Sequence, residues 1–188
     1  MLWVLVLPFS GCTTPIRADR TTTRAAYRET TKTALEGHCS HDARAVLHRH
    51  GLEDQFRKSP VECLLRLHEQ ACQDDRGDLL YALAELNYLH GERLARSARA
   101  GDVRQARDFH LAAAIYAWFF LTGSGCAASP EPFDRRFRVA CDRYNRAVAL
   151  GFVGGRRPET VVQWSRGARA LVPGAVQIEC HESTGDWT

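Results

Sequence analysis

Lysine is almost missing from this chain, and so is any concentration of positive charge. Lys32 and Lys58 are the only lysines, arginine supplies the other basic side chains, and the formal net charge is only +3. The arginines are spread over many segments, and they form no basic stripe of the kind that neutralises nucleic-acid phosphates. We therefore expect no nucleic-acid partner.

The chain also lacks an apolar run long enough to cross a membrane as a helix. The longest interior run extends from Leu111 to Leu121, whereas a bilayer requires about 20 apolar residues. Because this run leaves no polar face, we expect a core helix enclosed by other helices.

No arrangement of histidine and cysteine has recognisable metal-ligand spacing, and no C-x-x-C pair occurs. His68 and Glu69 begin like a zinc-protease helix, but Cys72 stands where the second histidine should be. The densest group of possible ligands straddles a predicted turn and consists of His38, Cys39, His41, His48 and His50. We expect no metal site.

Cofactor and nucleophile motifs are incomplete as well. The glycine-rich stretch 123–128 follows a helix, whereas a dinucleotide site needs a preceding strand. Ser165 lacks the first glycine of a nucleophile elbow and the helix that should follow it. His90 lies within an apolar stripe, where a histidine is typically a hydrogen-bonded core residue. We expect no cofactor and no catalytic residue.

The 188 residues, 45% of them hydrophobic and 25% charged, suit one main domain. Two long helices are predicted at its centre, from Leu79 to Ala98 and from Val103 to Leu121, separated by Gly101. On the first, leucines and His90 share one arc typical of a core-facing stripe. The opposite side is expected to carry Tyr81, Glu85, Tyr88, Glu92 and Arg96.

Further helical patterns flank this pair. Residues 24–36 carry a modest stripe, and a helix is predicted from Asp42 to His50 with Gly51 as its terminator. Residues 52–58 should add one short turn. Ser59, Pro60 and Glu62 form a helix-start signature for residues 60–72, whose inward face is expected to hold Val61, Leu64, Leu65, His68 and Cys72. Asp134 is expected to cap a last helix that ends near Gly151, with Phe137, Cys141, Tyr144 and Val148 on one stripe.

Beyond residue 152 the apolar period changes from helical to alternating. Glu159–Trp164 and Ala175–Cys180 are predicted as short strands, joined by Arg166–Gly174. The fold class is therefore expected to be mainly α, an irregular bundle of about five to six helices with a short C-terminal β-hairpin. The expected divisions are 24–152 for the helical domain and 153–188 for the hairpin segment.

The N-terminus looks like a lipoprotein leader. A short apolar run, residues 2–7, precedes Ser10-Gly11-Cys12, and small residues before a cysteine are typical of cleavage with lipid attachment to the thiol. Phe9 replaces the usual leucine, and no basic residue precedes the run. We predict a signal peptide at 1–12, lipidation of Cys12, a tether at 13–23 and a location at the cell envelope, on the outer membrane facing the periplasm.

The remaining six cysteines are even in number, and a periplasmic address would permit disulfides. Cys63 and Cys72 lie on opposite faces of one predicted helix and are too distant to pair with each other. We favour small apolar packing roles for several of the six.

Four segments together carry a family resemblance: GCTTPI, LLYALAELNYLHGERL, FHLAAAIYAWFFL and PEPFDRRFRVACDRYNRAVALGF. In this order they resemble the N-terminal part of bacterial lipoproteins that carry an α/β-hydrolase domain further along the chain. The resemblance implies that the nucleophile elbow, acid and histidine lie beyond residue 188, so only Cys12 transfers as a functional position.

The resulting expectation is a non-catalytic, membrane-anchored accessory domain of such a lipoprotein, truncated before its catalytic part. Its partners would be the membrane, through the lipid, and a protein or a separate hydrolase domain. The alternative is a self-sufficient helical scaffold that binds envelope proteins. Small and aromatic residues resemble those of tetratricopeptide helix pairs, although no 34-residue period repeats.

Overall fold

The computed structural model describes residues 22, 38–74, 77–97, 99–123, 129–152 and 167–179. Within them the chain forms six helices and one two-stranded antiparallel sheet, which confirms the mainly α fold with a short hairpin. The elements are α2 (His41–Arg49), α3 (Glu53–Lys58), α4 (Pro60–Gln73), α5 (Gly77–Ala95), α6 (Ala100–Thr122), α7 (Arg135–Phe152), β1 (Gly167–Leu171) and β2 (Gly174–Ile178).

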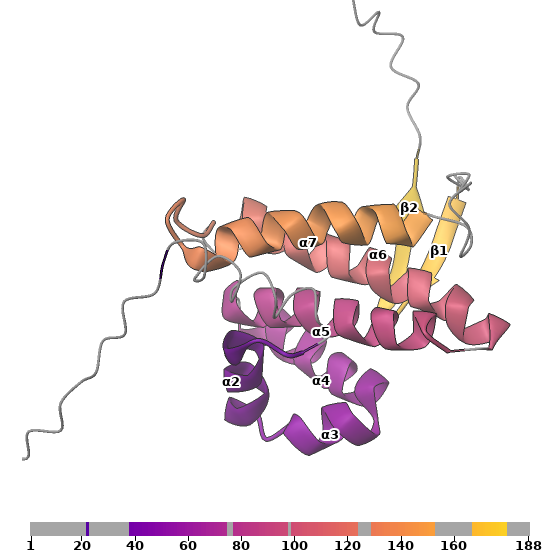
Figure 1. Ribbon diagram of the computed structural model, residues 1–188, viewed down its shortest axis with the longest axis horizontal. Coiled ribbons are helices and arrows are strands. Elements are labelled where there is room, and N and C mark those ends of the chain that lie inside the picture. Colours follow the sequence, from indigo (N-terminus) through magenta and orange to yellow (C-terminus); the bar gives the residue numbers. More distant parts are fainter. Residues whose placement is uncertain are drawn as a thin grey trace, which may run out of the picture.

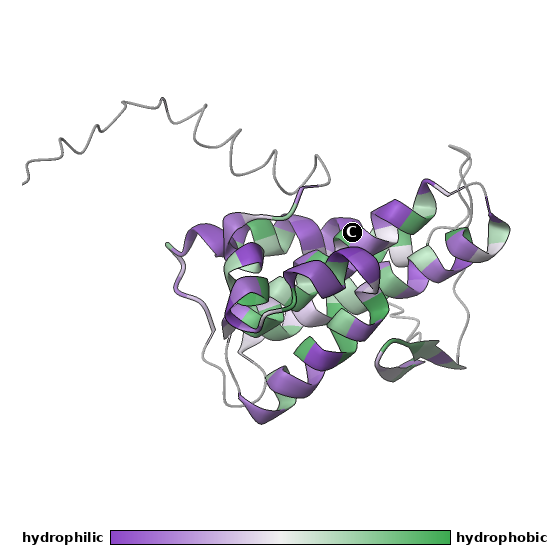
Figure 2. Cartoon of the chain, turned by 90° about the horizontal axis from the view of Figure 1, so that it is seen from below, coloured by the Kyte–Doolittle hydropathy of each residue, from purple (hydrophilic) through white to green (hydrophobic). Residues whose placement is uncertain are grey.

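Helix α5 is the centre of the bundle. Figure 1 shows it between α6 and α7 on one side and the shorter helices α2, α3 and α4 on the other, and it packs against α2, α4, α6 and α7. In Figure 2 the apolar positions gather where helices face one another. The main core cluster accordingly joins residues of five helices, α2 to α6.

Because α5 is covered on both sides, it has no solvent face over most of its length. Every residue from Tyr81 to Gly91 is buried, including Tyr81, Glu85 and Tyr88, which the stripe had placed on the opposite side. That prediction was wrong for these three residues. A single-stripe interpretation assumes that one face meets solvent, and the second layer of helices removes that face.

Helix α6 is the second long core element. Its Ala112, Ala113, Ala114 and Ala117 are buried, and small side chains let neighbouring helices approach closely. The helix ends at Gly123, whose φ of 66° lies in the left-handed region that glycine adopts without strain. The expected complete enclosure was wrong at the C-terminal end, where Trp118 and Phe119 are 49% and 39% exposed.

Helix α4 begins with Pro60 at its first position, as predicted, but the Ser59 side chain makes no capping hydrogen bond. The buried residues are Cys63, Leu64 and Leu67. The predicted inward face was therefore rotated by part of a turn, since Leu65 and Cys72 are exposed.

The boundaries of helices α2, α3 and α7 agree more closely with those predicted from the sequence. Gly51, with a φ of 64°, follows α2. The backbone N–H of Arg136 donates to Oδ1 of Asp134 at 2.8 Å, as expected of a residue that caps α7. The deepest residues of α7 are Ala140, Arg143, Ala147 and Gly151, whereas the predicted stripe one position away is half-buried.

The hairpin is displaced from its predicted position. Strand β1 occupies residues 167–171, within the segment expected to connect the strands, and pairs with β2 so that Ala170 lies opposite Ala175. The predicted strand Glu159–Trp164 lies outside the described residues. Arg169 anchors the hairpin, because its guanidinium donates to Asp108 of α6 at 2.7 Å and to the Gly151 carbonyl of α7 at 3.0 Å.

None of the helices within the described ranges combines the length and the apolar character that crossing a bilayer requires.

Candidate functional site

The predicted lipidation site Cys12 lies outside the described residues, as do Ser165 and positions 124–128 of the glycine-rich stretch. Their expected roles therefore stay predictions. The most deeply buried polar groups that the structure places together lie inside the helical bundle.

A buried ion pair joins α5 to α7. Nη2 of Arg143 lies 3.1 Å from Oε2 of Glu85, and the two side chains are only 2% and 1% exposed. The second carboxylate oxygen of Glu85 accepts a hydrogen bond from the backbone N–H of Ser40, immediately before α2. One carboxylate therefore connects three segments that are far apart in the sequence.

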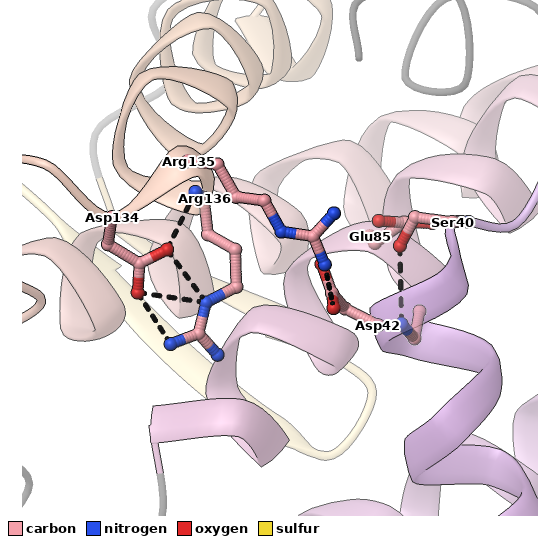
Figure 3. A network of polar contacts seen from close by, with 7 residues as sticks. Ser40, Asp42, Glu85, Asp134, Arg135 and Arg136 are labelled. Carbon is pink, nitrogen blue, oxygen red and sulfur yellow. Dashed lines mark hydrogen bonds and ion pairs between the residues drawn. The ribbon is translucent and has the colours of Figure 1, made fainter. Parts of the chain in front are cut away.

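The start of α2 is held by a second set of contacts, shown in Figure 3. The Ser40 hydroxyl accepts from the Ala43 N–H at 3.2 Å and caps the helix. Asp42 pairs with Arg135, the first residue of α7, at 2.5 Å. Together these contacts fix α2 against the N-terminal end of α7.

Arg143 also lies against an aromatic ring. Its guanidinium carbon is 5.3 Å from the ring centroid of Tyr81, a favourable cation–π distance. Burial raises the pKa of the Tyr81 phenol, and the positive charge of Arg143 opposes that shift. The tyrosine therefore stays neutral at physiological pH. Arg143 is only partly satisfied: Nη2 pairs with Glu85 and the guanidinium lies over the ring, whereas Nε and Nη1 lack hydrogen bonds.

This arrangement suits a structural role. A general acid or base has to be within hydrogen-bond reach of a substrate, whereas Glu85 and Arg143 are directed at each other inside the bundle. Removing one member would leave an uncompensated buried charge. The pair therefore holds the helices in one arrangement.

Two buried histidines form a separate polar region where α5 meets α6. His90 contacts Phe109 edge to face at 4.4 Å, and His110 lies 5.3 Å from Tyr88 between ring centroids. Burial lowers the pKa of both imidazoles to about 4, assisted by the positive charges of Arg93 and Arg146 respectively. Both rings are neutral at pH 7.

His90 is buried as predicted, but the expected hydrogen bonding is incomplete because its Nδ1 has no partner. Both ring nitrogens of His110 lack a hydrogen bond too, and the nearest acidic oxygen, on Glu92, is 3.7 Å from Nε2. The two neutral imidazoles therefore act as packing groups in the contact between α5 and α6.

The candidate metal ligands do not converge. Among the described residues, no group of three or more histidine, cysteine or acidic side chains is placed to hold an ion. His48 instead lies 3.4 Å from Glu53 on the exposed surface. His68 and Cys72, singled out for their zinc-protease-like spacing, do meet, with Nε2 and Sγ 3.6 Å apart.

Sequence reasoning missed the buried pair and one of the buried histidines. Glu85 was assigned to the wrong side of its helix, and Arg143 was not singled out. A usable signal was present: Ala140, Ala147 and Gly151 form a small-residue stripe on α7, and Arg143 lies within it. An arginine among small buried residues indicates a buried acidic partner, because an unpaired charge there is costly.

We compared the chain with protein families, with curated proteins and with solved structures, and none of them matches it.

Proposed function

We propose that this chain is a non-catalytic helical accessory domain of an envelope lipoprotein related to α/β-hydrolases, held at the membrane by lipid on Cys12. The observation that carries the non-catalytic part is the use of the most deeply buried charged groups, Glu85 and Arg143, to join helices. The anchoring part rests on the small residues that precede Cys12 after a short apolar run.

Lipid attachment is tested by metabolic labelling with an alkyne-bearing fatty acid in a Gram-negative host. We expect label on the wild-type protein in the membrane fraction. The Cys12→Ser variant should lose both the label and the membrane association, while Cys141→Ser serves as the matched cysteine control. An unlabelled wild-type protein that retains its leader in the cytosol would overturn the anchor.

The non-catalytic role is tested with the purified chain lacking residues 1–12. We expect no hydrolysis of short-chain p-nitrophenyl esters above the rate of a heat-denatured sample. A burst of nitrophenol stoichiometric with protein would contradict this role, because it reports an acyl-enzyme intermediate.

A second candidate function is a self-sufficient scaffold that binds envelope proteins. The exposed aromatic side chains of α6 favour it, because Trp118 and Phe119 are adjacent and Trp118 packs at a tilt against Tyr144 of α7, with ring centroids 5.7 Å apart. Aromatic residues are enriched at protein interfaces. A hydrolase reading frame adjoining this one in the genome would favour the accessory domain, and a stop codon with no such frame would favour the scaffold.

A further inference from the structure

The imidazole of His110 lies where α6 meets both α5 and α7. It is almost fully buried, and neither of its ring nitrogens has a hydrogen-bond partner. On the α5 side, a Cβ added to Gly91 would lie 2.9 Å from Cε1 of His110 and 3.0 Å from Nδ1. The ring of Tyr88 packs against the imidazole and shares a buried cluster with Ala147 of α7. Helix α7 therefore helps to close the space around His110.

Charged side chains approach this imidazole from each neighbouring element. On α5, the carboxylate of Glu92 is 3.7 Å from Nε2, beyond hydrogen-bond distance. On α7, the positive charge of Arg146 adds to the effect of burial and lowers the pKa of the ring. On β1, Arg169 is paired with Asp108 of α6 at 2.7 Å. A proton on His110 would thus place a second positive charge near Arg146, with no hydrogen bond to receive it.

The end of α7 and the hairpin both contact α6 beside His110. A Cβ on Gly151 would lie 3.3 Å from the backbone nitrogen of Leu111, the residue that follows His110. The Gly151 carbonyl accepts a hydrogen bond from Arg169 at 3.0 Å, and the same guanidinium donates to Asp108 at 2.7 Å. Residues 108–111 of α6 therefore support the last turn of α7 and β1 together.

Protonation of His110 disfavours this closed arrangement. A buried imidazolium loses its hydration and gains no hydrogen bond in exchange, so the charged form is costly there. When the ring is exposed to water, it titrates near about 6.5, whereas its pKa is about 4 in the closed arrangement. An opened state therefore binds more protons between these pH values, and its population grows as the pH falls.

We propose that His110 makes the contact of α6 with the C-terminal end of α7 and the hairpin sensitive to pH. Protonation of the imidazole releases residues 147–152 together with β1 and β2, while the rest of the bundle stays folded. Mild acid would then convert a fully packed bundle into one whose C-terminal part is open. This is a local change, distinct from unfolding of the whole domain.

The other end of α7 is held by contacts that contain no histidine. Glu85 pairs with Arg143 inside the bundle, and Asp42 pairs with Arg135 at the start of α7. These pairs keep the N-terminal part of α7 and α2 in place when the C-terminal part opens. The opening depends neither on lipid at Cys12 nor on either proposed function, so it can fail or hold independently of them.

The test is hydrogen exchange of the full chain at pH 7.5 and pH 5, corrected for the intrinsic exchange rate at each pH. We expect the opening equilibrium of residues 147–152 and 167–178 to increase about 30-fold at pH 5, as follows from the two pKa values. His110→Leu should abolish most of this increase. His90→Leu is the matched control at the other buried histidine, which packs on Phe109, and it should keep the increase in these two segments.

Residues 81–91 of α5 should exchange later than the two segments at both pH values, because they open only when the whole domain unfolds. Circular dichroism at pH 7.5 checks that each variant is folded. His110→Phe keeps an aromatic ring against Tyr88 and replaces His110→Leu if that variant does not fold. A full pH response in a folded His110 variant would overturn the proposal, and so would exchange of α5 in the same step as the two segments at pH 5.

Discussion

At the scale of single residues, the closest backbone approach to a glycine within the described ranges is at Gly91 of α5. A Cβ there would lie 2.9 Å from Cε1 of His110 and 3.1 Å from the Ala106 carbonyl oxygen. The imidazole can shift slightly, but the carbonyl belongs to the backbone of α6. The absence of a side chain at Gly91 therefore sets how closely α5 and α6 pack.

Gly91→Ala should destabilise the protein by about 1 to 3 kcal/mol, because overpacking forces two helices apart. Urea denaturation measures the change. Gly101→Ala is the control: its Cβ would meet nothing within 4 Å, and alanine in a helix should then be neutral or stabilising by up to about 1 kcal/mol. Equal effects at the two positions would show that the contact with α6 is unimportant.

The Glu85–Arg143 pair gives a second prediction at the residue scale. Arg143→Met should cost about 3 to 5 kcal/mol, since it leaves the Glu85 carboxylate buried without its ionic partner. Glu85→Leu combined with Arg143→Met should cost much less, because both charges are removed together. Thermal or urea denaturation gives the free energies of unfolding of both single variants and the double variant, which together form a double-mutant cycle. Additive losses would mean that the two side chains do not interact.

At the scale of elements, the hairpin depends on its contact with the helices. Two strands alone are marginally stable in water, and the hairpin contacts the bundle through β1, which lies against α6. Arg169 makes the polar part of this contact with Asp108 and Gly151.

Arg169→Ala should therefore release the hairpin while the helices stay folded. Hydrogen exchange should show lost protection in residues 167–178 and unchanged protection in α5 and α6. Arg138→Ala is the matched control, because Arg138 is 70% exposed and pairs with Asp142 on its own helix. Retained hairpin protection in Arg169→Ala would show that apolar contacts are sufficient.

At the scale of the whole molecule, the buried histidines predict sensitivity to acid. Their pKa values fall to about 4 in the folded chain, whereas an unfolded histidine titrates near about 6.5. Between these values the unfolded state binds more protons, so global stability decreases as the pH falls from about 6.5 towards 4.

His110→Leu should reduce the acid sensitivity. Relative to wild-type protein, its free energy of unfolding should improve by about 1 to 2 kcal/mol between pH 7.5 and pH 5, because one of the two depressed titrations is removed. Urea denaturation at both pH values measures the difference. His48→Leu, the same substitution at an exposed position, is the matched control. A parallel pH dependence in His110→Leu and wild-type protein would rule out the buried imidazole as the cause.

The sequence by itself determined the helical class, most helix ends and a C-terminal hairpin. The signals behind these predictions act on neighbouring residues, so they can be found in the sequence alone. They are the apolar periodicity and the helix-boundary residues Gly51, Pro60 and Gly123. Tertiary structure decided which side chains of α5 are buried and which polar groups meet. Glu85 pairs with a residue 58 positions away, and Tyr116 reaches His68 across 48 positions. Burial of a polar side chain depends on such distant partners, and a periodic pattern cannot supply them.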